Sequence, residues 1–406
     1  MNFLLLVFLS IVSYMFCDTN EVIICYNSFK PRFKNHSKII TLDAVPISDK
    51  EILLLTNEQN FSFISFPLNP LKGKVVGTFP ATFIVTLKNA KIFSHAGYVL
   101  YGKENKILYD TLWDWEDLDD DIWSNDFEFP EKLQKINGTV AVIAQKGGRN
   151  YYHWMTEALP RIYMLVKSGI KYDYLYVPFI LHEFQKVTLN MLGIDPDKII
   201  QGESDTLLQA EQLIIPSMPS ISTVSPLWVI DFLQNMFSNQ KKNLCKKYVS
   251  KNIYVSRKCA EQRKITNEEE LITLLKQYFD IVPVILEEFS VEEQAELFCN
   301  AEIIIAPHGA GLTNLVFAKP NTLVIEIFQY RLDETFWLLS QQLKLRHFCI
   351  LGIPDEELNK LKDPKFLKEV GNSINLDLDL IKIEDSLKKI HFNLSQNDHF
   401  RCEEGS

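Results

Sequence analysis

Short apolar runs separated by Pro, Gly and Asn make up the chain from Lys38 to Asp110. The runs are rich in β-branched and aromatic residues, which is typical of strands and hairpins. We therefore expect a β-rich region over residues 18–136. After Asn137 the pattern changes, because short apolar runs alternate with longer stretches of helical spacing. This alternation predicts strand–helix–strand units around a parallel sheet.

A first parallel α/β domain is expected at residues 137–225. The Ser- and Pro-rich stretch at 217–226 is the best candidate for the linker that ends it. Within that stretch, Ser225 and Pro226 suit the N-cap and the first position of the next helix. Strands are predicted at 138–145, 172–178 and 212–216, and helices at 152–167 and 182–192.

The alternation is more regular after the linker. Thr266 with Glu269, and Ser290 with Glu293, have the spacing of capping boxes at two helix starts. Because parallel neighbours need crossover connections, the order predicts a second parallel α/β domain at 226–353. Two further helical patterns predict a C-terminal helical tail at 354–406. The strands of the second domain are predicted at 252–256, 281–286, 302–306, 322–328 and 346–351.

Residues 1–16 are apolar almost throughout, and a polar run begins at Asp18. This pattern predicts a signal peptide at 1–17, because the segment is shorter than the roughly 20 residues of a membrane-spanning helix. It lacks an initial Lys or Arg, so an uncleaved anchor is the alternative. Either reading places the rest of the chain in a lumen. Candidate N-glycosylation triplets, which agree with entry into the secretory pathway, begin at Asn35, Asn60, Asn137 and Asn393.

Composition narrows the class of protein. With 47% hydrophobic residues and no long low-complexity tract, the chain is globular and not disordered. The net charge of -10 argues against a protein that mainly binds nucleic acid, and we expect no nucleic-acid partner. A negative net charge does not exclude a local basic pocket that binds phosphate.

The sharpest local signal is the turn after the predicted strand at 302–306. Glycines there permit close backbone approach, and a helix beginning near Leu312 offers N–H groups that favour an anionic phosphate. Thr313 and Asn314 could add side-chain donors. An ordinary strand-to-helix turn with glycines for packing is an equally good explanation. The candidate donor-binding residues of this loop are His308, Gly309, Ala310, Gly311, Thr313 and Asn314.

Three further residues are candidates on the same cleft edge, where ligands usually bind in doubly wound sheets. Glu326, near the end of the next strand, could accept hydrogen bonds from ribose hydroxyls, or it could simply be solvated. Arg257 and Arg263 flank one loop and could clamp a diphosphate and stabilise it as a leaving group. A charged surface loop is the alternative.

In the first domain, His153 and Glu157 lie at i and i+4 and therefore share one helix face, which Arg161 extends. His153 suits a general base, and Glu157 could orient it or act as the base itself. A network of capping or interdomain ion pairs is the alternative, and Arg161 is either an acceptor-site or a structural residue. No HExxH zinc motif is present. The acidic runs at 119–121 and 377–379 are expected to be solvated, so no metal site is predicted.

Several segments together, in this order, resemble glycosyltransferase family 61. The resemblance covers roughly residues 137 to 350 and depends on the order of the segments more than on any one of them. They are His153, Trp154, Glu157, Leu159, Pro160 and Arg161; Tyr254 to Arg257; Asn267 and Glu268; Glu293 and Gln294; and His308 to Asn314.

The resemblance implies a GT-B architecture with two facing Rossmann-like domains, inverting transfer from a nucleotide sugar, and no obligatory metal. Arg257, Arg263, the loop from His308 and Glu326 would bind the UDP-sugar, and residues 137–225 would present a glycoprotein or glycan acceptor. The location would be the lumen of the endoplasmic reticulum or Golgi, with a membrane partner only if the N-terminal segment stays uncleaved. The alternative function is a non-catalytic lumenal protein that binds carbohydrate or nucleotide. An NAD-dependent oxidoreductase is disfavoured because neither half contains GxGxxG.

Overall fold

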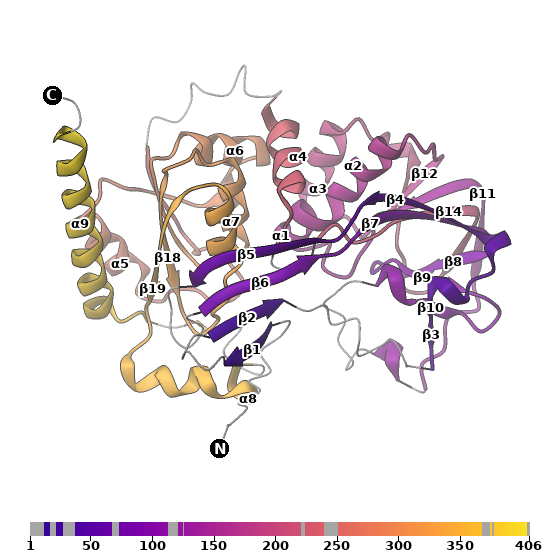
Figure 1. The fold of residues 1–406 in the computed structure, drawn as a ribbon, viewed down its shortest axis with the longest axis horizontal. Coiled ribbons are helices and arrows are strands. Elements are labelled where there is room, and N and C mark those ends of the chain that lie inside the picture. Colours follow the sequence, from indigo (N-terminus) through magenta and orange to yellow (C-terminus); the bar gives the residue numbers. More distant parts are fainter. Residues whose placement is uncertain are drawn as a thin grey trace.

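The computed structural model describes residues 12–16, 22–26, 37–66, 73–112, 121–124, 126–220, 224–238, 251–367, 374–375 and 377–403. Across these ranges the protein is a mixed α/β structure with a ten-stranded mixed sheet, a five-stranded parallel sheet and a four-stranded mixed sheet. Figure 1 shows the five-stranded parallel sheet and the larger sheet side by side. The predicted leader at 1–17 lies outside the described residues except for Val12–Phe16, which form a strand, β1.

The larger sheet has the order β13-β12-β11-β14-β8-β9-β10-β3, and β7 and β4 branch from β14. Its parallel part is β11 (Leu133–Val142), β12 (Tyr174–Val177), β13 (Ile199–Gln201) and β14 (Leu207–Pro216), which confirms the parallel strands expected after Asn137. The remaining strands are β3 (Ile39–Ile40), β4 (Lys50–Thr56), β7 (Thr82–Leu87), β8 (Ala90–Phe93), β9 (Tyr98–Tyr101) and β10 (Lys106–Leu108).

Strands from the β-rich region therefore continue the same sheet. β14 pairs antiparallel with both β7 and β8, so the sheet extends across residue 137 without a break. The four-stranded sheet is continuous in the chain with the pair β4–β7 of the larger sheet, because β4 leads into β5 and β6 leads into β7. Figure 1 shows it extending toward the five-stranded sheet. Its strands are β1, β2 (Val22–Tyr26), β6 (Gly73–Phe79) and β5 (Gln59–Phe66).

Helices lie on one side of the larger sheet, as Figure 1 shows for α2, α3 and α4. The predicted helix from Tyr152 is present with a wide π turn in its first part. It runs through α1 (Tyr151–His153), η6 (Trp154–Ala158) and α2 (Leu159–Ser168). Short π segments inside helices are frequent at functional sites. The other helices here are α3 (Glu183–Met191) and α4 (Leu227–Ser238), which begins one residue after the predicted start at Pro226.

The second sheet is the five-stranded parallel sheet that the sequence predicts, with the order β16-β15-β17-β18-β19. The strands are β15 (Asn252–Val255), β16 (Val282–Val284), β17 (Ile303–Pro307), β18 (Leu323–Phe328) and β19 (Arg346–Leu351). The connecting helices are α5 (Glu268–Leu275), α6 (Val291–Asn300), the 3-10 helix η9 (Ala310–Phe317) and α7 (Thr335–Gln342).

One of the two predicted capping boxes is confirmed. The Ser290 hydroxyl accepts from the Glu293 N–H at 3.2 Å, and the Glu293 carboxylate accepts from the Ser290 N–H at 2.9 Å. The box predicted at Thr266 is wrong, because α5 begins at Glu268 after the N-cap residue Asn267. The Thr266 hydroxyl donates instead to Asp377 in the tail, and this tertiary contact outcompetes the local cap.

One hydrophobic cluster joins both sheets. It contains Ala141 and Ile214 from the larger sheet together with Ile253 and Ile304 from the parallel sheet. The other face of the parallel sheet packs against α5 and the long helix α9 (Leu380–Glu403), which Figure 1 shows at the outer edge of the molecule. The rest of the tail forms η10 (Asp355–Lys362) and α8 (Pro364–Phe366).

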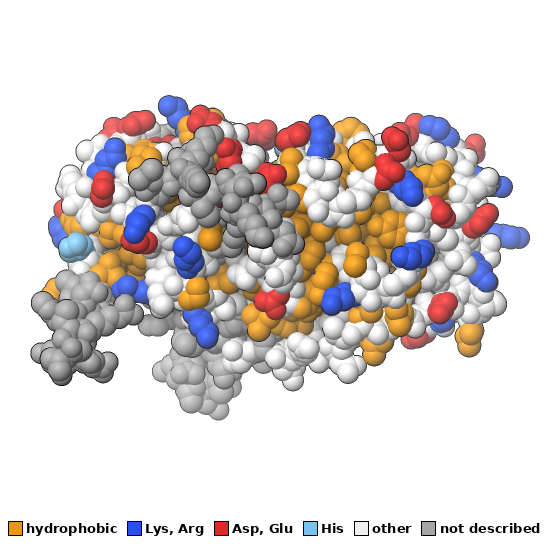
Figure 2. All heavy atoms as spheres, turned by 90° about the horizontal axis from the view of Figure 1, so that it is seen from above, with side chains coloured by type: hydrophobic (Ala, Val, Ile, Leu, Met, Phe, Trp, Pro, Cys, Tyr) orange, Lys and Arg blue, Asp and Glu red, His pale blue; other side chains and the backbone are white. Residues whose placement is uncertain are grey.

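The short 3-10 turns elsewhere are η2 (Leu42–Ala44), η3 (Ile47–Asp49), η4 (Tyr109–Thr111), η5 (Asp121–Trp123), η7 (Pro196–Lys198) and η8 (Leu286–Glu288). No helix within the described residues combines the length and the apolar character needed to cross a membrane. On the face seen in Figure 2, Lys and Arg side chains are interspersed with Asp and Glu, and apolar side chains lie between them.

Candidate active site

The predicted donor-binding residues gather at the carboxyl ends of β15 and β17, which are neighbours in the parallel sheet. Arg257 follows β15, and His308 follows β17 at the start of the glycine-containing loop. Adjacent parallel strands bring their carboxyl ends to one edge, where ligands usually bind. These residues are therefore far apart in the sequence but close together in the structure.

Two guanidinium groups converge on Gly309. Arg257 donates through Nε to the Arg263 carbonyl oxygen at 3.1 Å and through Nη2 to the Gln262 carbonyl oxygen at 2.8 Å. Its remaining amino group, Nη1, lies where any side chain on Gly309 would stand, and Arg263 Nη2 lies 3.9 Å from the same point. Gly309 has an extended backbone, so this position requires glycine because of the close approach and not because of its φ.

Burial disfavours the charged forms of Arg257 and Arg263. It lowers the pKa of Arg257 in spite of the nearby Glu287 and Glu268. Burial, and after it the charges of Arg257 and Arg331, lower the pKa of Arg263 to about 10, with Asp333 opposing them. Arg263 also has a φ of 58°, in the left-handed region. Such a conformation costs a non-glycine residue roughly 1–2 kcal/mol and tends to occur at functional sites. The arrangement favours an anionic ligand.

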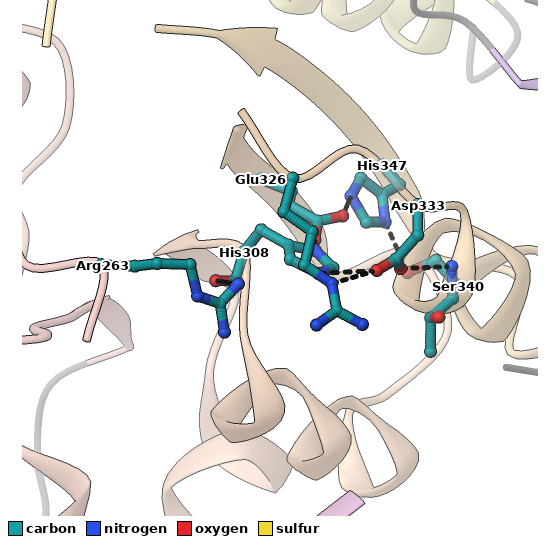
Figure 3. Close-up of polar contacts among 8 residues, drawn as sticks. Arg263, His308, Glu326, Asp333, Ser340 and His347 are labelled. Carbon is teal, nitrogen blue, oxygen red and sulfur yellow. Dashed lines mark hydrogen bonds and ion pairs between the residues drawn. The ribbon is translucent and has the colours of Figure 1, made fainter. Parts of the chain in front are cut away.

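His308 lies between two carboxylates (Figure 3). Its Nδ1 is 2.6 Å from Glu326 Oε1, and its Nε2 is 3.0 Å from Asp333 Oδ2. A neutral imidazole has only one N–H, so two carboxylate partners favour the charged ring, in which both nitrogens donate. Burial would lower the pKa of His308, but Asp333 and Glu326 outweigh it and raise that pKa. His308 is therefore a buried cation beside the two arginines.

Glu326 has a different position from the one expected of a ribose ligand. Its side chain is fully buried, and Oε2 lies 3.1 Å from His347 Nε2 while Oε1 faces His308. His347 Nδ1 in turn hydrogen-bonds the Ser340 hydroxyl at 2.7 Å. With both oxygens buried and next to histidines, this carboxylate orients His308 and does not reach the surface.

Thr313 and Asn314 also point inward, contrary to their expected role as phosphate donors. The Thr313 hydroxyl donates to the Ala310 carbonyl oxygen at 2.6 Å. The Asn314 amide donates to Gln294 Oε1 at 2.9 Å and accepts from the Tyr151 hydroxyl at 2.7 Å. Both side chains hold the loop in place, because their polar groups are satisfied inside the protein. Gly311 likewise faces the core, since a side chain there would contact Leu286.

His153 and Glu157 form the pair that their spacing predicts. His153 Nδ1 lies 2.9 Å from Glu157 Oε1, and the side chains are 18% and 1% exposed. Gln145 Nε2 donates to the other Glu157 oxygen at 3.3 Å. Because Glu157 is buried and partnered, His153 is the more accessible residue of the pair. The geometry favours His153 as the base and Glu157 as the residue that orients it.

Arg161, the third residue of this helix row, has a structural position. It is 2% exposed, and it donates to the Pro216 carbonyl oxygen at 3.0 and 2.7 Å and to the Ala144 carbonyl oxygen at 3.0 Å. Burial lowers its pKa to about 9, and Glu157 opposes this effect. Arg161 therefore ties the helix to the ends of β11 and β14.

A series of aromatic contacts connects the His153–Glu157 pair with the residues around His308. The His153 ring contacts Tyr152 with centroids 5.2 Å apart, Tyr152 contacts Phe336 at 5.9 Å, and Phe336 contacts His308 at 5.4 Å. The Tyr151–Asn314 hydrogen bond joins α1 to η9 at the same place. The helix that contains His153 thus contacts the loop that follows β17.

Among the described residues, one group of three possible metal ligands has its ligand atoms within 4.8 Å of one another: Glu326, His347 and Cys349. Glu326 and His347 already contact each other there, so we assign no metal to it. Asp377 and Asp379 accept from Thr266 and from the Lys382 N–H in the tail. Asp119 and Asp120 lie outside the described residues.

The glycosylation candidates Asn60, Asn137 and Asn393 are exposed, and Asn35 lies outside the described residues; their modification stays a prediction. Sequence reasoning missed Gln145, Arg331, Asp333 and His347. Arg331 and Asp333 carry a usable signal, because they follow β18 at the same sheet edge as Arg257 and His308. His347 offers no such signal, since only the pairing of β18 with β19 brings it to Glu326.

Comparison with known proteins matches residues 151–325 to the family Glycosyltransferase 61. The chain is 32% identical over 121 residues to protein O-linked-mannose beta-1,4-N-acetylglucosaminyltransferase 2 of Xenopus tropicalis, which covers 28% of this chain and 21% of the relative. It is 33% identical over 95 residues to beta-1,2-xylosyltransferase of Arabidopsis thaliana, covering 20% and 18%.

A third relative is the EGF domain-specific O-linked N-acetylglucosamine transferase of Gallus gallus, 33% identical over 92 residues, covering 22% of this chain and 17% of the relative. The chain thus spans about a fifth of the length of each of these relatives. The matched segment contains His153, Glu157, Arg257 and the loop from His308. Residues 151–325 of this chain therefore resemble glycosyltransferase family 61.

Proposed function

We propose that this chain is an inverting glycosyltransferase that moves a sugar from a UDP-sugar to a hydroxyl group of a protein or glycan acceptor. The observation that carries the proposal is the convergence of Arg257 and Arg263 on Gly309, beside the His308 cation. A diphosphate is the ligand that such a group of cations suits best. The proposal includes a GT-B arrangement, with residues 226–353 binding the donor and 137–225 presenting the acceptor.

The reaction needs stabilisation of the departing UDP. As the bond between the sugar C1 and the diphosphate oxygen breaks, negative charge develops on that oxygen. Arg257 and Arg263 are already fixed by hydrogen bonds to backbone carbonyls, so they can meet this charge with little reorganisation. We infer that this fixed positive charge replaces an obligatory metal ion.

His153 takes the proton of the acceptor hydroxyl in this scheme. Its Nδ1–H donates to Glu157, which selects the tautomer whose Nε2 carries the lone pair. The acceptor oxygen then attacks C1 from the face opposite the leaving diphosphate, and the proton moves to Nε2. Glu157 stabilises the imidazolium that forms, as a buried carboxylate behind a catalytic histidine does.

The relatives guide the choice of substrates. Their names describe transfer of N-acetylglucosamine or xylose, in one case to O-linked mannose and in another to an EGF domain. We therefore propose a hexosyl or pentosyl donor, with UDP-N-acetylglucosamine first and UDP-xylose second. The proposed location is the lumen of the endoplasmic reticulum or Golgi, in agreement with the apolar N-terminal segment.

The test is a donor screen that measures UDP release by the purified protein, with acceptor glycopeptides and with or without a chelator. Replacing Arg257 with Ala should lower turnover at least ~10²-fold, because it removes one charge-stabilising donor. The neighbouring Lys258→Ala is the matched control, since Lys258 is exposed and loses the same charge. Binding of UDP without transfer from any donor would instead identify a non-catalytic binding protein.

A further inference from the structure

Arg331 lies in the loop after β18 and outside the segment that matches the family. Its Nε is 3.1 Å from Asp333 Oδ2, and its side chain is 40% exposed. Within the part of the chain that the structure describes, no hydrogen-bond partner is present for its two terminal amino groups. Arg331 is thus held through Nε, while its two terminal amino groups remain available to a ligand.

Asp333 fixes the orientation of this guanidinium. The same oxygen that contacts Arg331 lies 3.0 Å from His308 Nε2, and the other oxygen accepts from the Thr335 N–H at 3.2 Å. Burial would raise the pKa of Asp333, but His308 and then Arg331 hold it well below its usual range. Asp333 is therefore ionised at neutral pH, and its contacts with His308 and Thr335 hold its carboxylate in place.

A buried chain of side chains supports Asp333 from behind. Figure 3 shows His308 between Asp333 and Glu326, with His347 and Ser340 beyond Glu326. His308 is 7% exposed, and Glu326 and His347 have fully buried side chains. Close packing restricts all of them to one arrangement. The position of Arg331 is thereby linked to the interior of the parallel sheet.

Arg331 shares its surroundings with the other two arginines. Arg331 contacts Asp333, Asp333 contacts the His308 ring, and the His308 carbonyl oxygen accepts from Arg263 Nη1 at 3.5 Å. The charge of Arg331, like that of Arg257, accordingly lowers the pKa of Arg263. Asp333 is the carboxylate that offsets Arg263, while Glu287 and Glu268 offset Arg257. Like charges held this close repel one another unless an anion lies among them. Arg257 is restrained through Nε and Nη2, which leaves Nη1 for recognition, and Arg331 is restrained through Nε, which leaves both of its terminal amino groups.

We propose that Arg331 is a third anion-binding guanidinium of the donor site and contacts the diphosphate of the nucleotide sugar. This inference rests on the proposed function. A diphosphate offers two phosphate groups to three guanidinium groups, whereas a nucleoside monophosphate offers one. Arg331 therefore contributes to the preference for a nucleoside diphosphate over a monophosphate.

The experiment measures the affinity of the full chain for UDP and UMP by calorimetry, for the wild type and for Arg331→Gln. Losing one partly exposed charge-assisted contact should weaken UDP binding about tenfold and UMP binding much less. Raising the salt concentration should also weaken UDP binding less steeply in the variant, because it has one charge fewer in contact. Arg346→Gln is the matched control, since Arg346 is exposed at the opposite end of β19 and its loss should leave both affinities unchanged.

Asp333→Asn provides a second, independent variant. It keeps Arg331 but removes the anion that orients it, so UDP affinity should fall while a UDP–UMP preference is partly retained. Unchanged UDP affinity in Arg331→Gln, with Arg257→Ala strongly weakened, would overturn the inference and leave the proposed function standing. Equal losses for UDP and UMP would overturn it as well, because they indicate general damage to the site. A wild-type protein that binds no UDP would overturn the proposed function and this inference together.

Discussion

Glu326→Gln tests whether His308 is a buried cation. The substitution keeps the shape of the side chain and removes the charge that lies 2.6 Å from His308 Nδ1 and 3.1 Å from His347 Nε2. A carboxylate can accept from both rings, but a Gln amide has only one acceptor oxygen. If its NH₂ group faced the charged His308 ring, in which both nitrogens donate, it would find no acceptor there. Nothing else in the immediate packing needs to change.

The magnitude follows from the contact that is lost. A hydrogen bond to a charged group contributes about 1.5–3 kcal/mol to the free energy of unfolding, so the variant should be less stable by that amount. The direction in which this stability difference changes with pH follows from the difference between the folded and unfolded pKa values of His308. The pKa of His308 is raised in the folded protein, so its contribution is complete below the unfolded value of about 6.5 and is lost as the pH rises through the folded pKa. The difference between variant and wild type should therefore shrink at alkaline pH.

Urea unfolding followed by tryptophan fluorescence, at about pH 6 and about pH 9, measures this difference. Glu302→Gln is the matched control, because Glu302 forms an exposed pair with Lys251 at 2.6 Å on the same sheet. That variant should lose no more than about 1 kcal/mol at either pH. A Glu326→Gln penalty that stays constant or grows toward alkaline pH would refute the argument for a charged His308.

Three other substitutions test residues of the helix that runs through α1, η6 and α2. His153→Ala should lower the turnover number at least ~10²-fold, with a smaller effect for Glu157→Gln, which keeps the hydrogen bond but not the charge; steady-state transfer assays measure both, and full activity of both variants would remove the pair from the mechanism. Arg161→Met should lower the free energy of unfolding by about 2–5 kcal/mol, because it leaves the carbonyl oxygens of Pro216 and Ala144 unpaired in the interior; denaturant unfolding measures it, and a loss below about 1 kcal/mol would contradict the structural role.

Local patterns were sufficient for much of the fold. The apolar runs at 252–256 and 302–306 are strands because several consecutive buried positions, bounded by polar residues, favour strands within a parallel sheet. The Ser290 cap was predictable for the same reason, since both partners lie within one turn of the chain. Where a tertiary partner competed, as Asp377 does for Thr266, the local rule failed.

The amino-acid sequence by itself determined the five parallel strands, the glycine loop after β17, the paired His153 and Glu157, and the resemblance to glycosyltransferase family 61. Only the tertiary structure decided what these groups face. Glu326 contacts histidines because β18 and β19 pair in a register that puts His347 beside it, and Asn314 turns inward because Tyr151 and Gln294 meet it there. Such choices depend on partners far apart in the chain, so neither residue type nor spacing contains them.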